Sequence, residues 1–153
     1  MALARYFDDF VVGQIYQSGE YQLTEEEIVA FARQYDPQPI HIDPDIARGT
    51  EFGLIASGFH TAAVTMRLFV MSDASAVLGS VGIGVDRLRW RSPVRAGDRL
   101  HASFTIDNLT PSTRRPGWGK VRTLAQVRNQ NEVEVLEALM LALVPGRPLG
   151  QRA

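Results

Sequence analysis

The sequence contains no cysteine, which excludes a disulfide framework, thiolate metal sites and a cysteine nucleophile. It has almost no net charge, −1 at pH 7, so no overall field attracts nucleic acid or an anionic membrane surface. No apolar run approaches the roughly 18 residues of a membrane span, and the first residues lack the apolar core of a signal peptide. We therefore expect a cytoplasmic protein that binds neither nucleic acid nor membranes.

The length and composition are those of one globular domain. A chain of 153 residues can bury a core of its own. Its hydrophobic fraction of 45% and charged fraction of 22% are ordinary for such a domain. No repeat, low-complexity tract or linker divides the sequence. We expect a single domain over residues 1–153, with residues 145–153 forming a loose tail.

A helix is expected to begin after Thr24, because Thr24 can cap it and Glu27 can reach back to the cap. Apolar residues then recur at helical spacing: Ile28, Phe31, Ala32 and Tyr35. Pro37 disfavours helical geometry in the residue before it. Asp36 is therefore expected at the end of this helix, where a loop begins.

The remaining pattern predicts one buried helix and an antiparallel sheet. Residues 59–71 are apolar nearly all round, and such a helix is normally wrapped by other elements. Residues 86–91, 100–107 and 121–128 alternate with the period of a strand. Residues 133–144 suit a helix by composition or a strand buried on both faces. We favour the strand, because the strands before it need a neighbour, and the fold class is then α+β.

Residues 36–43 read Asp-Pro-Gln-Pro-Ile-His-Ile-Asp and hold the most informative side chains of the chain. They place the carboxylate of Asp36 and the imidazole of His41 on a proline-stiffened loop, and Gly58 then opens the central helix. A carboxylate and an imidazole around one water can move a proton. A free N–H at a helix N-terminus can stabilise a carbonyl oxygen that gains charge. We predict these three residues to be catalytic, with Asp36 as the base if burial raises its pKa.

The neighbours of Gly58 are candidate substrate contacts, namely Ser57, Phe59 and His60. Ser57 also suits a helix cap, and His60 also suits packing in the interior; Asp43 suits a second cap or a support for the loop histidine. A metal site built from the histidines and this carboxylate has no further support. A serine nucleophile lacks the usual elbow pattern. We expect no metal and no bound cofactor, and we expect Trp90 to pack on the sheet.

Several motifs in one order make the chain resemble the MaoC-like dehydratases, also called R-specific enoyl-CoA hydratases, of the hotdog fold. They are the opening segment 6–14, the loop 36–43, the helix start 55–61 and the segment 89–98 with its Val-x-x-Gly-Asp turn. The resemblance implies a long helix cradled by a curved sheet in a homodimer or higher homo-oligomer, with the active site between subunits. It also implies interconversion of trans-2-enoyl-CoA and (R)-3-hydroxyacyl-CoA.

The same resemblance assigns roles within this chain. Asp36 and His41 carry the acid–base work, the Gly58 N–H binds the thioester oxygen, and coenzyme A or acyl-carrier protein enters only as part of the substrate. Some members fix the motif loop with a serine inside the central helix; here Thr65 or Met66 falls near that place, and of the two only Thr65 can form a hydrogen bond. Two basic sets are open as contacts for the coenzyme A phosphates: Arg87, Arg89 and Arg91, or Arg114, Arg115 and Lys120. The alternatives in function are a hotdog thioesterase and a non-catalytic acyl-thioester-binding partner subunit.

Overall fold

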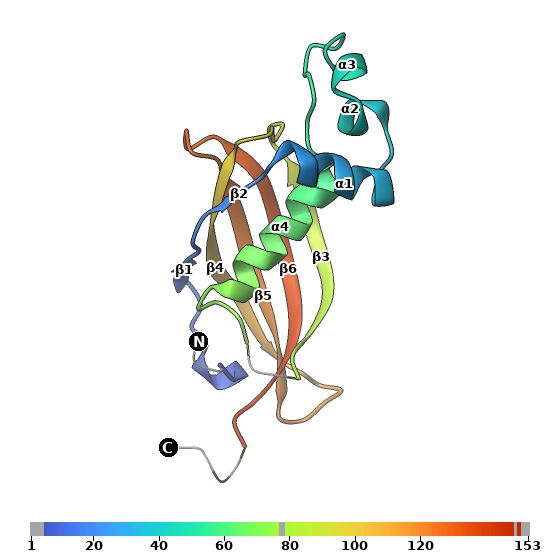
Figure 1. The fold of residues 1–153 in the computed structure, drawn as a ribbon. Coiled ribbons are helices and arrows are strands. Elements are labelled where there is room, and N and C mark those ends of the chain that lie inside the picture. The colour runs from blue at the N-terminus through green and yellow to red at the C-terminus, as the bar shows by residue number, and fades with distance from the viewer. Residues whose placement is uncertain (1–4, 77–78, 149, 151–153) are drawn as a thin grey trace.

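A computed structural model describes residues 5–76, 79–148 and 150. The long helix α4 (Gly58–Met71) crosses one face of a six-stranded sheet, and three shorter helices gather beyond its N-terminal end (Figure 1). The predicted α+β class is therefore confirmed. This arrangement brings the end of the first helix close to the start of the central one.

Each strand of the sheet pairs antiparallel with its neighbours, in the order β1-β4-β5-β6-β3, and β2 also pairs with β4. The strands are β1 (Ile15–Gln17), β2 (Tyr21–Gln22), β3 (Val81–Trp90), β4 (Arg99–Pro111), β5 (Trp118–Arg128) and β6 (Glu134–Pro145). The ambiguous stretch 133–144 is thus a strand, as predicted. It is bonded on both sides, by β5 and β3, which explains its nearly continuous apolar character.

The short helices follow local capping signals. Helix α1 (Glu25–Tyr35) begins with the predicted capping box, in which the Glu27 N–H donates to Thr24 Oγ1 and the Thr24 N–H donates to the Glu27 carboxylate. The proline-rich loop is itself helical, as α2 (Pro39–Ile42) and α3 (Pro44–Ala47). Asp43 caps α3, as expected, by accepting two backbone N–H bonds. Within the described residues, no helix has the length and apolarity needed to cross a membrane.

The core fills the space between α4 and the inner face of the sheet, where Leu100, Phe104 and Ile106 of β4 are fully buried. Helix α4 packs against the sheet as predicted, but the described residues of a single chain do not cover all of it. Four of its apolar side chains are exposed: Phe59, Met66, Val70 and Met71. The neighbouring edge strand β3 exposes four more: Val81, Ile83, Val85 and Trp90. The described residues therefore leave this apolar surface of α4 and β3 uncovered.

Two further expectations are corrected by the backbone. Strand β3 has an irregularity between Asp86 and Arg89, and Arg87 adopts a φ of 51°. The alternation expected to place Arg87, Arg89 and Arg91 on one face is therefore interrupted. The tail expected at 145–153 is held at its start, because the Gly146 N–H bonds to a loop carbonyl and the Arg147 N–H to a carboxylate near the N-terminus; residues 149 and 151–153 lie outside the described part.

Candidate active site

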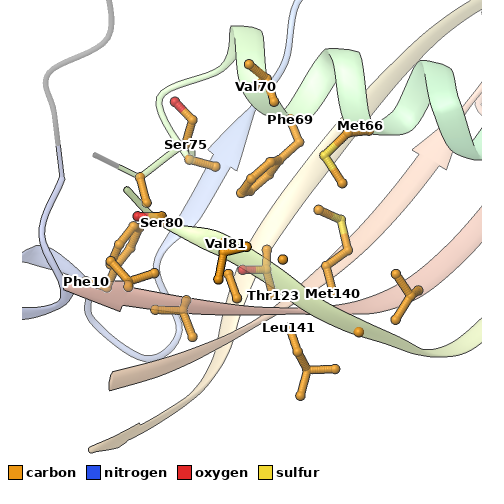
Figure 2. A pocket seen from close by; sticks show the side chains of 18 of the residues that line it. Phe10, Met66, Phe69, Val70, Ser75, Ser80, Val81, Thr123, Met140 and Leu141 are labelled. Atoms are coloured by element: carbon orange, nitrogen blue, oxygen red, sulfur yellow. The ribbon is translucent and has the colours of Figure 1, made fainter. Parts of the chain in front are cut away.

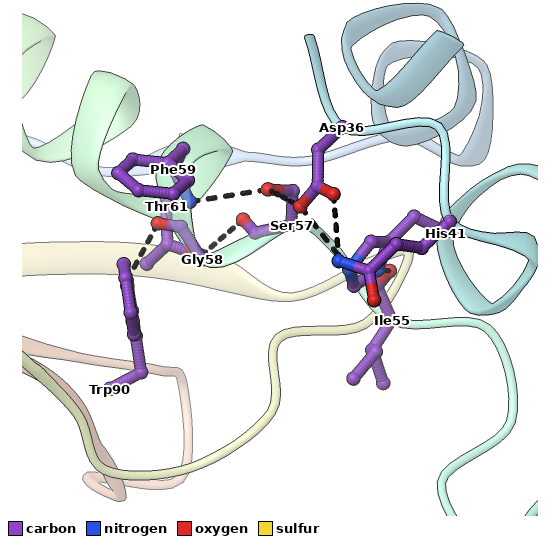
Figure 3. Close-up of polar contacts among 9 residues, drawn as sticks. Asp36, His41, Ile55, Ser57, Gly58, Phe59, Thr61 and Trp90 are labelled. Atoms are coloured by element: carbon purple, nitrogen blue, oxygen red, sulfur yellow. Dashed lines mark hydrogen bonds and ion pairs between the residues drawn. The ribbon is translucent and has the colours of Figure 1, made fainter.

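The residues singled out in the loop and at the helix start meet in one pocket of about 400 Å³. Asp36 comes from the end of α1, His41 from α2 and Gly58 from the first turn of α4 (Figure 3). Phe59 and Trp90 close one side of the same pocket. The structure thus brings together all three residues predicted to be catalytic.

Asp36 caps the C-terminus of α1 with a non-helical backbone, φ −151° and ψ 69°, as the proline after it requires. Its Oδ2 accepts a 2.6 Å hydrogen bond from the Ser57 hydroxyl, and its Oδ1 accepts one of 2.7 Å from the Gln38 amide. The bond from Ser57, then that from Gln38, lowers the pKa of Asp36 below its ordinary value, with a smaller contribution from His41. The raised pKa that a carboxylate base requires is therefore not found.

His41 is buried, and its two ring nitrogens have different partners. Its Nδ1 lies 2.7 Å from the Ile55 carbonyl oxygen, which can only accept, so Nδ1 carries the proton of the neutral ring. Its Nε2 lies 3.5 Å from Oδ2 of Asp36 (Figure 3). In the neutral state an unprotonated nitrogen therefore faces a carboxylate oxygen.

Two acceptors that face each other need a donor between or beside them. A water molecule satisfies both by donating one hydrogen to Nε2 of His41 and the other to Oδ2 of Asp36. Such a water has its lone pairs directed away from both side chains and into the pocket. The pair can therefore hold a water as a nucleophile and take a proton from it.

Gly58 is the first residue of α4, and its N–H has no intrahelical acceptor. Among the described residues, no hydrogen bond uses this N–H. The sequence suggests that a glycine keeps the N–H accessible, but the structure shows a different constraint. A Cβ at this position would lie 2.4 Å from the Trp90 ring, whose Nε1–H donates a 2.7 Å bond to the Gly58 carbonyl oxygen.

Ser57 caps α4, as predicted, by accepting a bond from the Phe59 N–H at 3.3 Å. Sequence reasoning missed its second bond, the one it donates to Asp36. Thr65 does not bond to the motif loop, because its hydroxyl donates to the Thr61 carbonyl one turn back in α4. The bond from the start of α4 to the loop comes from Ser57 instead, which donates to the Asp36 carboxylate.

The other candidate contacts separate into those near the pocket and those away from it. Phe59 lines the pocket and meets the Trp90 ring edge-on, with centroids 5.3 Å apart. His60 does not line it; the ring is buried and stacks on Phe31 of α1 at 4.6 Å. Trp90, expected only to pack, lies at the wall of the pocket. No local signal marks that position, because it depends on where β3 ends.

The basic residues give no clear phosphate site. Arg91 borders the pocket, but its guanidinium pairs with Glu134 and Glu137 of β6. The hairpin with the second basic set joins β4 and β5 at the end of the sheet opposite to α1, α2 and α3 (Figure 1). Its Arg115 lies over the Trp118 ring. The hairpin set is therefore far from the Asp36–His41 pocket.

Comparison with known proteins identifies the family of this chain. The family described as MaoC like domain matches residues 10–129. The chain is 30% identical to the uncharacterized protein YdeM of Bacillus subtilis, over 90% of this chain and 96% of that protein. It is 28% identical to the (R)-specific enoyl-CoA hydratase of Rhodospirillum rubrum, over 95% of each. The crystal structure of a MaoC-like dehydratase from Rhodospirillum rubrum matches with a TM-score of 0.89 at 39% identity, over 95% of this chain and 100% of that one.

Proposed function

The chain belongs to the MaoC-like dehydratase domain family and has its hotdog fold, and from this premise we propose that it interconverts trans-2-enoyl-CoA and (R)-3-hydroxyacyl-CoA thioesters. One observation carries the proposal: Nε2 of His41 and Oδ2 of Asp36 lie 3.5 Å apart in a pocket that the Gly58 helix start also borders. The name of the Rhodospirillum rubrum hydratase supports the substrate class. Coenzyme A, or an acyl-carrier protein, is part of the substrate in this proposal.

In the hydration direction, the water held by the pair attacks the β-carbon. As the new C–O bond forms, an O–H bond of the water breaks and its proton passes to Nε2 of His41. The electron pair of the double bond moves to the thioester oxygen, which the Gly58 N–H stabilises with the help of the helix dipole. The imidazolium then returns the proton to the α-carbon. Dehydration is the reverse of these steps.

The proposed roles differ from the sequence-based one in the choice of base. A carboxylate that accepts bonds from Ser57 and Gln38 is a weak base, as its lowered pKa indicates. A neutral imidazole nitrogen is ordinarily the stronger base. We therefore assign proton transfer to His41. Asp36 orients the water and stabilises the imidazolium with its negative charge.

Incubation with crotonyl-CoA tests this function. Hydration removes the enone absorbance without releasing a thiol, whereas a thioesterase releases free coenzyme A. We expect loss of enone absorbance in the wild type and not in His41→Gln. Thiol release, with enone loss no faster than in buffer, would support the thioesterase instead. Binding of crotonyl-CoA without either change would support a non-catalytic subunit.

The proposed working state is a homodimer. The exposed Met66 and Val70 of α4 and Val81 and Val85 of β3 line one groove, and among the described strands β3 is an edge strand bonded to β6 alone. A monomer rarely leaves such a surface to water, and an unpaired edge is a template for another strand. A second copy offers the same apolar side and the same edge, which suits a two-fold interface.

A further inference from the structure

Two apolar cavities lie between α4 and the sheet, beyond the Asp36–His41 pocket. The larger has a volume of about 560 Å³ and borders the C-terminal half of α4 (Figure 2). The smaller has a volume of about 60 Å³ and lies nearer the start of the helix, against Ala62. Both are lined by Met66, Val85 and Met140, so they adjoin. We call the two together the α4 groove.

The α4 groove stops just short of the candidate active site. Gly58 borders the site and Ala62 borders the groove, and these residues are only one helical turn, about 6 Å, apart. Among the described residues, none lines both spaces. Trp90 lines the active-site pocket, and Leu88, two residues earlier in β3, lines the groove.

The Trp90 indole is held in place by contacts on two sides. Its Nε1–H donates to the Gly58 carbonyl oxygen at 2.7 Å, and its ring lies so close to that glycine that a Cβ there would approach it to 2.4 Å. The Phe59 ring packs against it edge-on. Trp90 also pairs with Leu136 in the β3–β6 ladder. Turning the indole away would break the hydrogen bond and the aromatic contact.

We propose that Trp90 is a specificity-determining residue, which closes the active-site pocket off from the α4 groove and so restricts the protein to short acyl chains. This inference rests on the proposed function. A short acyl group needs only the pocket around Asp36 and His41. A longer chain gains affinity by removing its methylene groups from water. The apolar space next to the site that can receive them is the part of the α4 groove against Ala62, because it is lined by the buried Thr65, Leu136 and Ala138 and not only by the exposed residues proposed for the dimer interface.

Binding of saturated acyl-CoA thioesters tests the barrier without turnover. We would measure Kd by calorimetry for butyryl-CoA and octanoyl-CoA. The wild type is expected to bind octanoyl-CoA no more tightly than butyryl-CoA. Trp90→Ala is expected to bind octanoyl-CoA at least about tenfold more tightly than butyryl-CoA, because the extra methylenes reach the groove. Thermal unfolding of each variant shows that it is folded.

Two control variants separate the barrier from other effects. Trp90→Phe loses the bond to Gly58 but keeps a ring, and is expected to keep the wild-type ratio of the two Kd values. Trp90→Ala/Ala62→Leu refills the entrance of the groove and is expected to lose the gain. The proposal that Trp90 is a barrier is contradicted if the wild type already binds octanoyl-CoA about tenfold more tightly than butyryl-CoA. It is also contradicted if Trp90→Ala leaves the ratio of the two Kd values unchanged. Absence of turnover with every enoyl-CoA would instead overturn the proposed function, while these binding ratios would still decide on the barrier.

Discussion

The Ser57 hydroxyl donates a 2.6 Å hydrogen bond to Oδ2 of Asp36 and thereby joins the start of α4 to the end of α1. Ser57 is fully buried and the Asp36 side chain is 19% exposed, so this bond is partly shielded from competing water. The same oxygen of Asp36 faces Nε2 of His41. One hydroxyl thus fixes the carboxylate relative to both the imidazole and the Gly58 N–H of the neighbouring helix turn.

Ser57→Ala is expected to lower kcat for crotonyl-CoA hydration by about 10- to 100-fold, because a hydrogen bond to a charged group contributes about 1.5–3 kcal/mol. It should also raise the pKa of Asp36, since the largest cause of the lowered value is removed. Carboxyl NMR titration of Asp36 measures this shift directly, whereas the pH–rate profile also depends on protonation of the proposed base His41. Thr65→Val is the control, because among the described residues that hydroxyl bonds within α4. Equal rates and an equal pKa of Asp36 in Ser57→Ala and the wild type would contradict the role of this bond.

Asp36→Asn is expected to lower the hydration rate about 10²–10⁴-fold, and His41→Gln to do the same, because each removes half of an acid–base pair. Residues that act as a unit are not additive. The double variant should therefore lose no more than about tenfold beyond the slower single variant. Steady-state kinetics of the four proteins measures this coupling. An unchanged rate in Asp36→Asn would remove that residue from the mechanism.

Sedimentation equilibrium tests the proposed homodimer. The wild type is expected at twice the chain mass of 17.0 kDa. Val70→Glu places a charge on the exposed apolar side of α4 and should shift the protein toward the monomer, because a charge buried without a partner is costly. Ile15→Glu, at an exposed isoleucine of β1 on the opposite edge of the sheet from β3, is the control and should remain dimeric. A wild type that sediments at 17.0 kDa would refute the dimer.

Features set by neighbours in sequence could be predicted from the sequence. The capping box at Thr24, the helix end at Asp36 and the cap at Asp43 each depend on residues within four positions. The joint appearance of Asp36, His41 and Gly58 in one pocket followed from a motif rather than from any local signal. The correct prediction of a strand at 133–144 also used the strands predicted before it, which needed a neighbour.

Features set by distant contacts could not be predicted. Ser57 and Asp36 are 21 positions apart, and Trp90 and Gly58 are 32 apart. The sequence around a serine or a tryptophan does not indicate a distant hydrogen-bond partner, because the packing of whole helices and strands determines which side chains come into contact. The irregularity in β3 is similar, since the alternation around Arg87 is that of a regular strand while its backbone is not.

His60 offers a pH dependence that is separate from the catalytic pair. Burial lowers its pKa below the ordinary value of 6.5, and the Glu27 carboxylate opposes this by less. The folded protein keeps this ring neutral at pH values where the unfolded chain binds the proton, so the free energy of unfolding falls as pH drops below about 6.5. Its buried Nδ1 has no hydrogen-bond partner among the residues that the structure describes, so the protonated ring would carry a buried unpaired donor there.

His60→Phe should therefore flatten this dependence, because a phenyl ring keeps a ring against Phe31 and does not titrate. Thermal unfolding at about pH 7.5 and about pH 5.5 should show a smaller loss of Tm in the variant than in the wild type, as groups with unchanged pKa values cancel in the comparison. Phe31→Leu is the control: it removes the stack and leaves the histidine, so its Tm should be lower at both pH values and still fall on acidification. Parallel losses of Tm in His60→Phe and the wild type would show that another group controls acid stability in this range.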